Sequence, residues 1–197
     1  MKPRPDPFAH LDEWYAEARA SEPQPEAAAL ATVRADGQPS NRIVLVRRWD
    51  EWGFEVFTNL QSRKAHEVAA HPAAALVFHW KAAGHGGRQV RIEGNVERMS
   101  GTESDAYWAT RPRGSQISAL ASEQSQPVAD RATLLARRDA LEAEYPEGIP
   151  VPRPGHWGGL RLVPARFEFW QHEDDRFHQR LAYERVPGGW ETTILQP

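Results

Sequence analysis

The sequence of 197 residues contains no cysteine. This absence excludes disulfide frameworks, thiolate zinc sites, iron–sulfur clusters and cysteine nucleophiles. It fits a reducing compartment, so we expect a cytoplasmic protein. Lysine is scarce, because Lys2, Lys64 and Lys81 are the only lysines among 24 basic residues. The excess of arginine is mainly compositional, although arginine also offers a planar fork for phosphate or carboxylate groups.

Strongly basic and strongly apolar segments are also missing. The formal net charge is −3, which does not favour a nucleic-acid-binding protein. No apolar run approaches the roughly 20 residues of a membrane span, and the N-terminal segment lacks the apolar core of a signal peptide. We therefore expect neither nucleic acid nor membrane as a partner. A chain of this length can bury roughly 70% of its unfolded surface without help from metals or disulfides.

Short apolar runs separated by turn signals predict a mainly β protein with peripheral helices, of the α+β class. Residues 1–7 are expected to form a mobile arm and residues 8–197 a single domain. Strands are predicted over residues 28–34, 42–49, 53–58, 73–80, 88–97, 159–170, 176–185 and 190–195. Helices are predicted over residues 8–18, 62–70, 102–110, 115–122 and 128–145. This order is not the alternation of a parallel sheet, and it favours an antiparallel barrel.

The sequence lacks the motifs of three common kinds of functional site. The glycine-rich loop at 84–87 has neither the lysine-serine pair of a phosphate-binding P-loop nor the spacing of a dinucleotide fingerprint. His66 and His71 lie five residues apart, about 140° around a helix, so they cannot share a metal. No serine lies in the GxSxG pattern of a hydrolase. We expect no metal site.

A predicted helix opens with Ser62, Arg63 and Lys64. Ser62 is a plausible N-cap, but two cations in the first turn oppose the helix dipole. A bound anion would resolve that conflict, because a helix N-terminus with added cations binds phosphate well. The alternative is an exposed pair of cations with a small energetic penalty.

Two further groups suggest anion recognition. On a predicted strand, Arg176, His178 and Arg180 would share one face, where an anionic ligand or the preceding acidic residues would offset their repulsion. Tyr107 and Arg111 are four apart on a predicted helix, shortly before Ser115 begins another. This second group could converge on one phosphate, or it could be an ordinary corner between helices.

Several blocks in the same order resemble the pyridoxine/pyridoxamine 5′-phosphate oxidase family. They are RIVLVRRWDEWGFEVFTNLQSRKAHEV (42–68), RQVRIEGNVERMSGTESDAYWATRPRGSQISALASEQS (88–125) and VPRPGHWGGLRLVPARFEFWQHEDDRFHQR (151–180). The resemblance covers nearly the whole chain. It implies a homodimer of antiparallel split β-barrels, with FMN in each of two clefts at the subunit interface.

The resemblance also implies roles for individual residues. The implied FMN contacts are Arg42, Ile43, Val44, Leu45, Phe57, Thr58, Arg63, Lys64, Gln89, Gln124, Ser125, Trp170 and Arg180, some of them from the partner subunit. The implied contacts to the substrate phosphate are Arg47, Tyr107, Arg111 and Ser115. Arg176 and His178 would lie against the substrate ring, and they are the candidate catalytic residues for orientation and proton handling.

The chemistry implied is oxidation of pyridoxine or pyridoxamine 5′-phosphate to pyridoxal 5′-phosphate, with O₂ reduced to H₂O₂. Departures from the family pattern concern the substrate side: Arg47 replaces the usual lysine, Gln179 replaces an acid, and the chain ends in ILQP. Strict alternation also places Arg42 and Arg47 on opposite strand faces, which requires a bulge or separate ligands. The alternatives are a related FMN oxidase acting on another ring, as in phenazine pathways, and a flavin- or pyridoxal-phosphate-binding protein with little catalysis.

Overall fold

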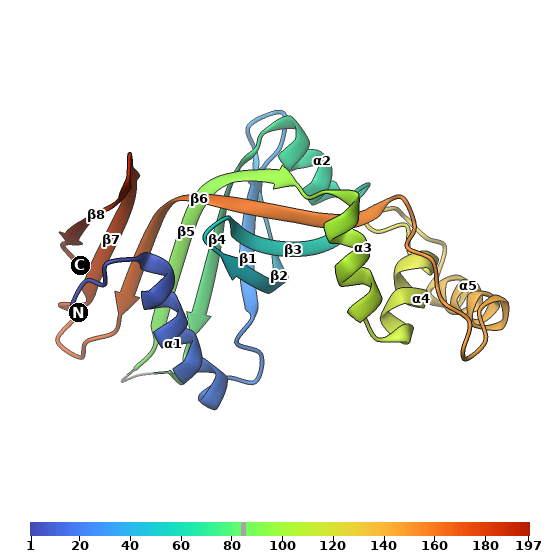
Figure 1. The fold of residues 1–197 in the computed structure, drawn as a ribbon, viewed down its shortest axis with the longest axis horizontal. Helices are drawn as coiled ribbons and strands as arrows, with labels where there is room; N and C mark the ends of the chain where they lie inside the picture. The colour runs from blue at the N-terminus through green and yellow to red at the C-terminus, as the bar shows by residue number, and fades with distance from the viewer. Residues whose placement is uncertain (84–85) are drawn as a thin grey trace.

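The computed structural model describes residues 1–83 and 86–197 (Figure 1). Gly84 and His85, part of the glycine-rich loop, lie outside the described residues. The strands described are β1 (Ala27–Val33), β2 (Pro39–Asp50), β3 (Gly53–Asn59), β4 (Ala73–Trp80), β5 (Arg88–Arg98), β6 (Trp157–Gln171), β7 (Gln179–Val186) and β8 (Gly189–Leu195). The helices described are α1 (Pro7–Ser21), α2 (Arg63–Ala70), α3 (Gly101–Thr110), α4 (Arg113–Ala121) and α5 (Arg131–Glu144).

The strands form one antiparallel sheet in the order β3-β2-β1-β4-β5-β6-β7-β8. An additional pairing of β3 with β6 closes the first six of these into a barrel, while β7 and β8 continue the sheet beyond it. Figure 1 shows α3, α4 and α5 at one end of the molecule, with β7 and β8 at the other. The predicted mainly β fold, an antiparallel barrel with peripheral helices, is confirmed.

Aromatic side chains fill the barrel and bind α1 to it. Phe54, Phe78 and Phe167 are completely buried in the core. From α1, the ring of Phe8 packs edge-on against Phe167 at a centroid distance of 5.2 Å, and Leu11 is also fully buried. Each such side chain contributes roughly 1.5–3 kcal/mol through removal of apolar surface from water. The apolar face predicted for residues 8–18 is therefore the face that α1 buries.

Helix caps explain where two helices begin. Asp6 accepts hydrogen bonds from the backbone N–H groups of Phe8 and Ala9, so α1 starts at Pro7. Asp130 caps α5 in the same way through the N–H of Thr133. The predicted helix over 128–145 is therefore too long at its start, because a cap with extended backbone at Asp130 stops the helix there.

The predicted strand over 176–185 is wrong at its beginning. Strand β7 starts at Gln179, and Arg176 lies in a turn with φ +67°. A side chain in this turn does not follow the two-residue alternation of a strand. Arg176, His178 and Arg180 therefore do not form the row on one strand face that the sequence predicted.

A β-bulge lies in β2 at Arg47. Val46 pairs with Val56 and Arg48 pairs with Glu55, so Arg47 is the extra residue in the ladder. A bulge interrupts the alternation of faces and turns the strand locally. The structure thus contains the bulge that the sequence offered as one of two solutions for Arg42 and Arg47, while separate ligands for the two arginines stay a prediction.

Strand β6 connects the two ends of the molecule. Trp157 at its start pairs with Asn59 in the barrel, and Trp170 near its end pairs with both Gln89 and Arg180. Trp170 follows Trp157 by thirteen positions, roughly 40 Å of extended strand. Groups placed near the two ends of β6 therefore lie far apart in one chain (Figure 1).

Candidate active site

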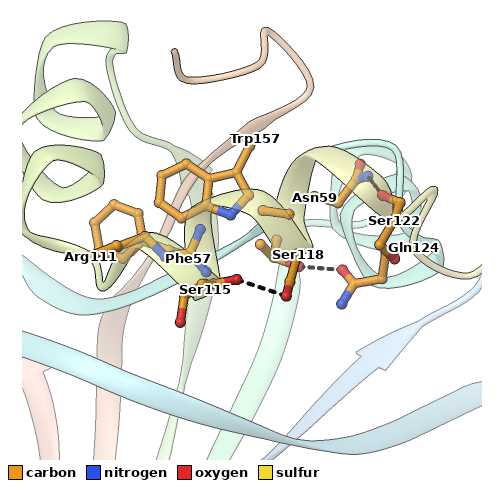
Figure 2. Close-up of a pocket in the computed structure, with 11 residues that line it drawn as sticks. Phe57, Asn59, Arg111, Ser115, Ser118, Ser122, Gln124 and Trp157 are labelled. Carbon is orange, nitrogen blue, oxygen red and sulfur yellow. Dashed lines mark hydrogen bonds between the residues drawn. The ribbon is translucent and has the colours of Figure 1, made fainter. Parts of the chain in front are cut away.

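A cavity of about 490 Å³ lies where α4 faces the end of β3 (Figure 2). Its lining residues are Phe57, Thr58, Asn59, Arg111, Gly114, Ser115, Ser118, Ala119, Ser122, Gln124 and Trp157. A second cavity of about 170 Å³ shares Phe57, Thr58 and Gln124 with it. The other lining residues of the second cavity are Ile43, Val44, Leu45, Arg47, Val56 and Lys64. The two cavities therefore adjoin and bring together ten of the residues predicted from the sequence.

Lys64 lies in a polar cluster at the junction of these cavities. Its ammonium group donates to Thr58 Oγ1 at 2.7 Å, to Gln124 Oε1 at 2.9 Å and to Ser62 Oγ at 3.1 Å. Burial, aided by the positive charge of Arg42, lowers the pKa of Lys64 to about 8. Ser62 precedes α2 as predicted, but its side chain makes no capping hydrogen bond and instead accepts from Lys64.

Glu67 holds two of the predicted cations in place. Its carboxylate is buried and accepts from Arg42 at 2.8 Å and from Arg63 Nε at 2.9 Å, and Thr32 Oγ1 donates to it at 2.5 Å. Although burial raises the pKa of Glu67, these hydrogen bonds outweigh that effect and lower it to about 2. The carboxylate is therefore ionised and fixes both guanidinium groups near the start of α2.

Arg63 and Ser125 border a third cavity of about 420 Å³, which lies beside α2. The backbone N–H of Arg63 donates to Ser125 Oγ at 3.2 Å. Ser125 has a φ of +77°. Among the described residues, Ser125 and Arg176 are the only residues other than glycine with a positive φ. Such backbone strain concentrates at functional sites, and both residues were predicted to belong to one.

Arg111 brings a half-buried positive charge to the larger cavity. Its NH1 atom is buried and has no hydrogen-bond partner among the described residues. Burial lowers the pKa of Arg111, and the positive charge of Arg47 lowers it further. The positive charges of Arg47 and Arg111 therefore repel each other across the adjoining cavities. An anion bound between the two guanidinium groups would offset this repulsion.

The start of α4 adds uncharged donors to Arg111. Pro112 precedes α4 and provides no side-chain cap, so the N–H groups of Arg113 and Gly114 have no capping partner among the described residues. The N–H of Ser115 donates to the carbonyl oxygen of Pro112 at 2.9 Å. Gly114 and Ser115 from this first turn line the cavity, and a Cβ at Gly114 would meet no atom within 4 Å. Backbone donors, a hydroxyl group and a guanidinium therefore surround one part of the cavity.

Tyr107 lies behind this group rather than in the cavity wall. Its ring stacks on Phe57 at 3.9 Å with an interplanar angle of 17°. The structure thus brings Arg111 and Ser115 to one cavity and places Tyr107 beside them as the support of Phe57.

The remaining predicted residues lie near the other end of β6. Gln89, Trp170 and Arg180 form a lateral row, since each pairs with the next across β5, β6 and β7. Arg180 is held by the buried carboxylate of Glu168, to which its Nε donates at 2.9 Å. Its NH1 also donates to the carbonyl oxygen of Gln196 at 2.9 Å.

His178 packs beside this row. Its ring centroid lies 4.7 Å from that of Trp170. Its Nδ1 lies 3.1 Å from the backbone nitrogen of Glu173, and that N–H donates to it. Because Nδ1 is an acceptor, the proton of the neutral ring is on Nε2. His178 can therefore offer an N–H to a bound molecule. Arg176 is exposed in the preceding turn.

The sequence did not predict several residues that line the larger cavity. Asn59, Ser118, Ser122 and Trp157 line the larger cavity. In Figure 2, Trp157 lies on the side of Arg111 and Ser115, while Asn59 and Ser122 lie toward Gln124. Ser118 and Ser122 follow Ser115 by three and seven positions, a helical spacing that could have shown them on one face of the predicted helix over 115–122. Asn59 and Trp157 gave no comparable signal, because their pairing across β3 and β6 depends on closure of the barrel.

Among the described residues, no helix is long and apolar enough to cross a membrane. Within the same residues, no group of three or more histidine or acidic side chains is arranged to hold a metal ion.

The fold defines the class of the protein as a split β-barrel. Residues 15–143 match the family described as pyridoxamine 5′-phosphate oxidase. Residues 157–197 match the family described as the pyridoxine 5′-phosphate oxidase C-terminal dimerisation region. The chain therefore belongs to the pyridoxine/pyridoxamine 5′-phosphate oxidase family, as the sequence blocks indicated.

Known relatives agree with this membership. A pyridoxine/pyridoxamine 5′-phosphate oxidase of Burkholderia cenocepacia (strain HI2424) is 52% identical over 197 residues, which cover 98% of this chain and 90% of that protein. One from Novosphingobium aromaticivorans is 49% identical and covers 99% of this chain and 95% of that protein.

Two solved structures resemble the fold. PhzG from Burkholderia lata 383, in complex with tetrahydrophenazine-1-carboxylic acid, has a TM-score of 0.92 at 34% identity and covers all of this chain and 95% of PhzG. A pyridoxamine 5′-phosphate oxidase-related, FMN-binding protein from Nostoc punctiforme has a TM-score of 0.78 at 18% identity, with complete coverage of both chains. The second likeness concerns the fold alone.

Proposed function

We propose that this protein is an FMN-dependent oxidase that converts pyridoxine 5′-phosphate or pyridoxamine 5′-phosphate to pyridoxal 5′-phosphate. Molecular oxygen is the electron acceptor and H₂O₂ the second product. The observation that carries the proposal is the buried, unpartnered NH1 atom of Arg111, in a cavity that also presents Ser115. A phosphorylated substrate supplies the anion that this arrangement favours.

The residues near α2 fit the phosphate group of FMN. Arg42, Arg63 and Lys64 carry three positive charges, and Glu67 offsets one of them. The remaining charge of about +2 matches a phosphate monoester at neutral pH. The adjoining cavity edge, formed by residues 43–45 together with Phe57 and Thr58, gives the flavin a place beside this phosphate site.

The second half of the flavin site comes from a partner subunit in this proposal. Gln89, Trp170 and Arg180 lie near the far end of β6 from the cavities, so one chain does not bring both groups together. In a symmetric dimer, each far end can meet the cavities of the other chain. The match of residues 157–197 to a dimerisation region supports this assembly, because it contains Trp170 and Arg180.

Bound FMN would supply the two-electron oxidation at the substrate C4′ carbon, with transfer of the electrons to O₂. The side chains of this chain bind and orient the substrate. Arg47, Arg111 and Ser115 hold its phosphate, with Tyr107 supporting the wall beside them. His178 donates its Nε2–H to the substrate ring, and Arg176 contacts the same ring from its exposed turn. This orientation keeps the reacting carbon in place.

A second candidate function is oxidation of another ring, as in phenazine pathways. The observation that favours it is the likeness to PhzG, whose structure holds tetrahydrophenazine-1-carboxylic acid. The departures Gln179 and the ILQP ending lie on the substrate side and agree with it. The phosphate-binding features around Arg111 favour the first function, because a ring without phosphate would leave them unused. A flavin- or pyridoxal-phosphate-binding protein with little catalysis is the third candidate.

The test is reconstitution of the purified protein with FMN, followed by assay of peroxide and aldehyde formation. We expect a yellow protein that forms both products from pyridoxine or pyridoxamine 5′-phosphate. A protein that cannot be reconstituted with FMN would overturn the flavin function altogether. A yellow protein that oxidises neither compound but accepts a phenazine precursor would replace the first function with the second. Bound flavin without turnover of any of these compounds would favour the third candidate.

A further inference from the structure

Arg111 lies in a corner formed by two tryptophans. Its guanidinium carbon is 4.6 Å from the ring centroid of Trp157 and 5.1 Å from that of Trp108. The two indoles meet edge to face at 4.8 Å with an interplanar angle of 68°. The guanidinium therefore faces two indole rings whose negative π surfaces attract a cation.

Both indoles are themselves fixed. Trp108 donates its Nε1–H to the carbonyl oxygen of Val151 at 2.8 Å, and it is buried. Trp157 is the first residue of β6, is 4% exposed, and lies nearly parallel to Phe57 at 5.5 Å. The corner is therefore rigid before any ligand binds.

Around Arg111, the two indoles occupy the position that a carboxylate occupies beside other partly buried arginines of this protein. Arg42 and Arg180 pair with Glu67 and Glu168. Arg111 makes no ion pair with any residue that the structure describes, although its NH1 is buried. A carboxylate would neutralise the guanidinium and compete with a bound anion, whereas an indole face stabilises the cation and leaves its charge available.

We propose that Trp157 is a positioning residue that holds the Arg111 guanidinium toward the cavity and thereby makes the site select substrates bearing a phosphate. The inference rests on the proposed function, since it assigns a selectivity device to that same substrate site. Trp157 is the better of the two indoles for this role because it also lines the cavity, whereas Trp108 does not.

The experiment compares Trp157→Leu and Trp157→Phe in the FMN-loaded protein. For each variant, KM and kcat are measured with pyridoxine 5′-phosphate and with pyridoxine, and inorganic phosphate is titrated as a competitive inhibitor. We expect Trp157→Leu to raise KM for the phosphorylated substrate and the inhibition constant of phosphate about tenfold. Turnover at saturation and KM for pyridoxine should change less than threefold. Trp157→Phe, which keeps an aromatic face, should lie between Trp157→Leu and the unmodified protein.

Tyr145→Leu is the matched control. Tyr145 packs against the same apolar cluster as Trp157 but is not placed over Arg111. We expect Tyr145→Leu to leave the preference for the phosphorylated substrate intact even if this substitution lowers the stability of the protein. Circular dichroism and flavin content check that each variant is folded and loaded. Should Trp157→Leu fail to fold, Trp157→Phe carries the test through its own rise in the inhibition constant of phosphate.

The outcomes separate this inference from the proposed function. Unmodified protein that does not prefer the phosphorylated compound would overturn the proposed substrate itself. Unmodified protein with that preference, together with folded Trp157 variants that keep it in full, would overturn only the role of Trp157. Equal losses on both substrates would also overturn it, because they indicate general damage rather than positioning of Arg111.

Discussion

The ammonium group of Lys64 donates a 2.9 Å hydrogen bond to Oε1 of Gln124, a residue sixty positions further along the chain. This bond joins the start of α2 to the segment after α4, and Thr58 of β3 takes part in the same cluster. The cluster therefore places a titratable cation at the junction of two cavities.

The affinity for FMN should fall as the pH rises above about 8. Burial lowers the pKa of Lys64 from 10.5 to about 8, so the free protein loses this charge above that pH. Below it, the ammonium group is present and attracts the phosphate. Fluorescence titration with FMN between pH 6.5 and 9.5, values chosen to bracket this pKa, measures the effect.

Two controls isolate the charge on Lys64. Lys64→Arg should give an affinity that stays flat with pH, because a guanidinium does not titrate in this range. Riboflavin, which lacks the phosphate, should bind the unmodified protein with no comparable loss. An equal decline for riboflavin would show that Lys64 does not act on the phosphate.

Glu67 should make stability depend on acidity. Its pKa in the folded protein is about 2, below its ordinary value of 4.5, so the ionised form stabilises the fold. This contribution is complete above the ordinary pKa and is lost as the pH falls through the folded value. Glu67→Gln should therefore lower the urea midpoint at pH 7, and the difference should shrink between pH 4.5 and 2.

The matched variant is Glu93→Gln. Glu93 also binds two arginines, Arg91 and Arg166, but it is partly exposed and lies away from α2. We expect a smaller effect on the midpoint, since exposed ion pairs stabilise little. A pH profile of Glu67→Gln that runs parallel to that of the unmodified protein would refute the assignment.

Arg176→Ala should impair turnover more than it impairs FMN binding. Arg176 is exposed in its turn and makes no ion pair with the described residues, so its side chain is free to contact a substrate. Its φ of +67° suits glycine, so Arg176→Gly removes the same side chain and relieves the backbone. Both variants should lose kcat/KM similarly while retaining flavin. Loss of flavin from either would place Arg176 at the cofactor instead.

Local patterns in the sequence predicted much of the fold. The interval 73–80 is β4 to the residue, and the apolar spacing from Phe8 to Ala18 is the buried face of α1. The strand predicted to begin at Arg176 begins only at Gln179, because the acidic residues 173–175 favour a turn before it. An alternating pattern alone does not reveal where such a turn ends.

The site was less accessible to sequence reasoning than the fold. Two cations at a helix start, Arg63 and Lys64, indicated an anion site or an exposed pair, and the anion site stays a prediction. A conflict of strand faces indicated either a bulge or separate ligands for Arg42 and Arg47, and the structure has a bulge at Arg47. The indole corner around Arg111 was not predicted, because Trp157 reaches it only through closure of β3 on β6. Long-range contacts of this kind leave no periodic trace in the sequence.

The most direct test asks whether each active site combines Lys64 of one chain with Arg180 of its partner. Lys64→Ala and Arg180→Ala, each inactive alone, are co-expressed with different tags and the mixed dimers are assayed with pyridoxine 5′-phosphate. Each hybrid dimer has one intact site of two, so we predict that the purified hybrids recover about half of the unmodified activity per dimer. Hybrid dimers as inactive as either parent would contradict it, because a site contained within one chain would be damaged in every subunit.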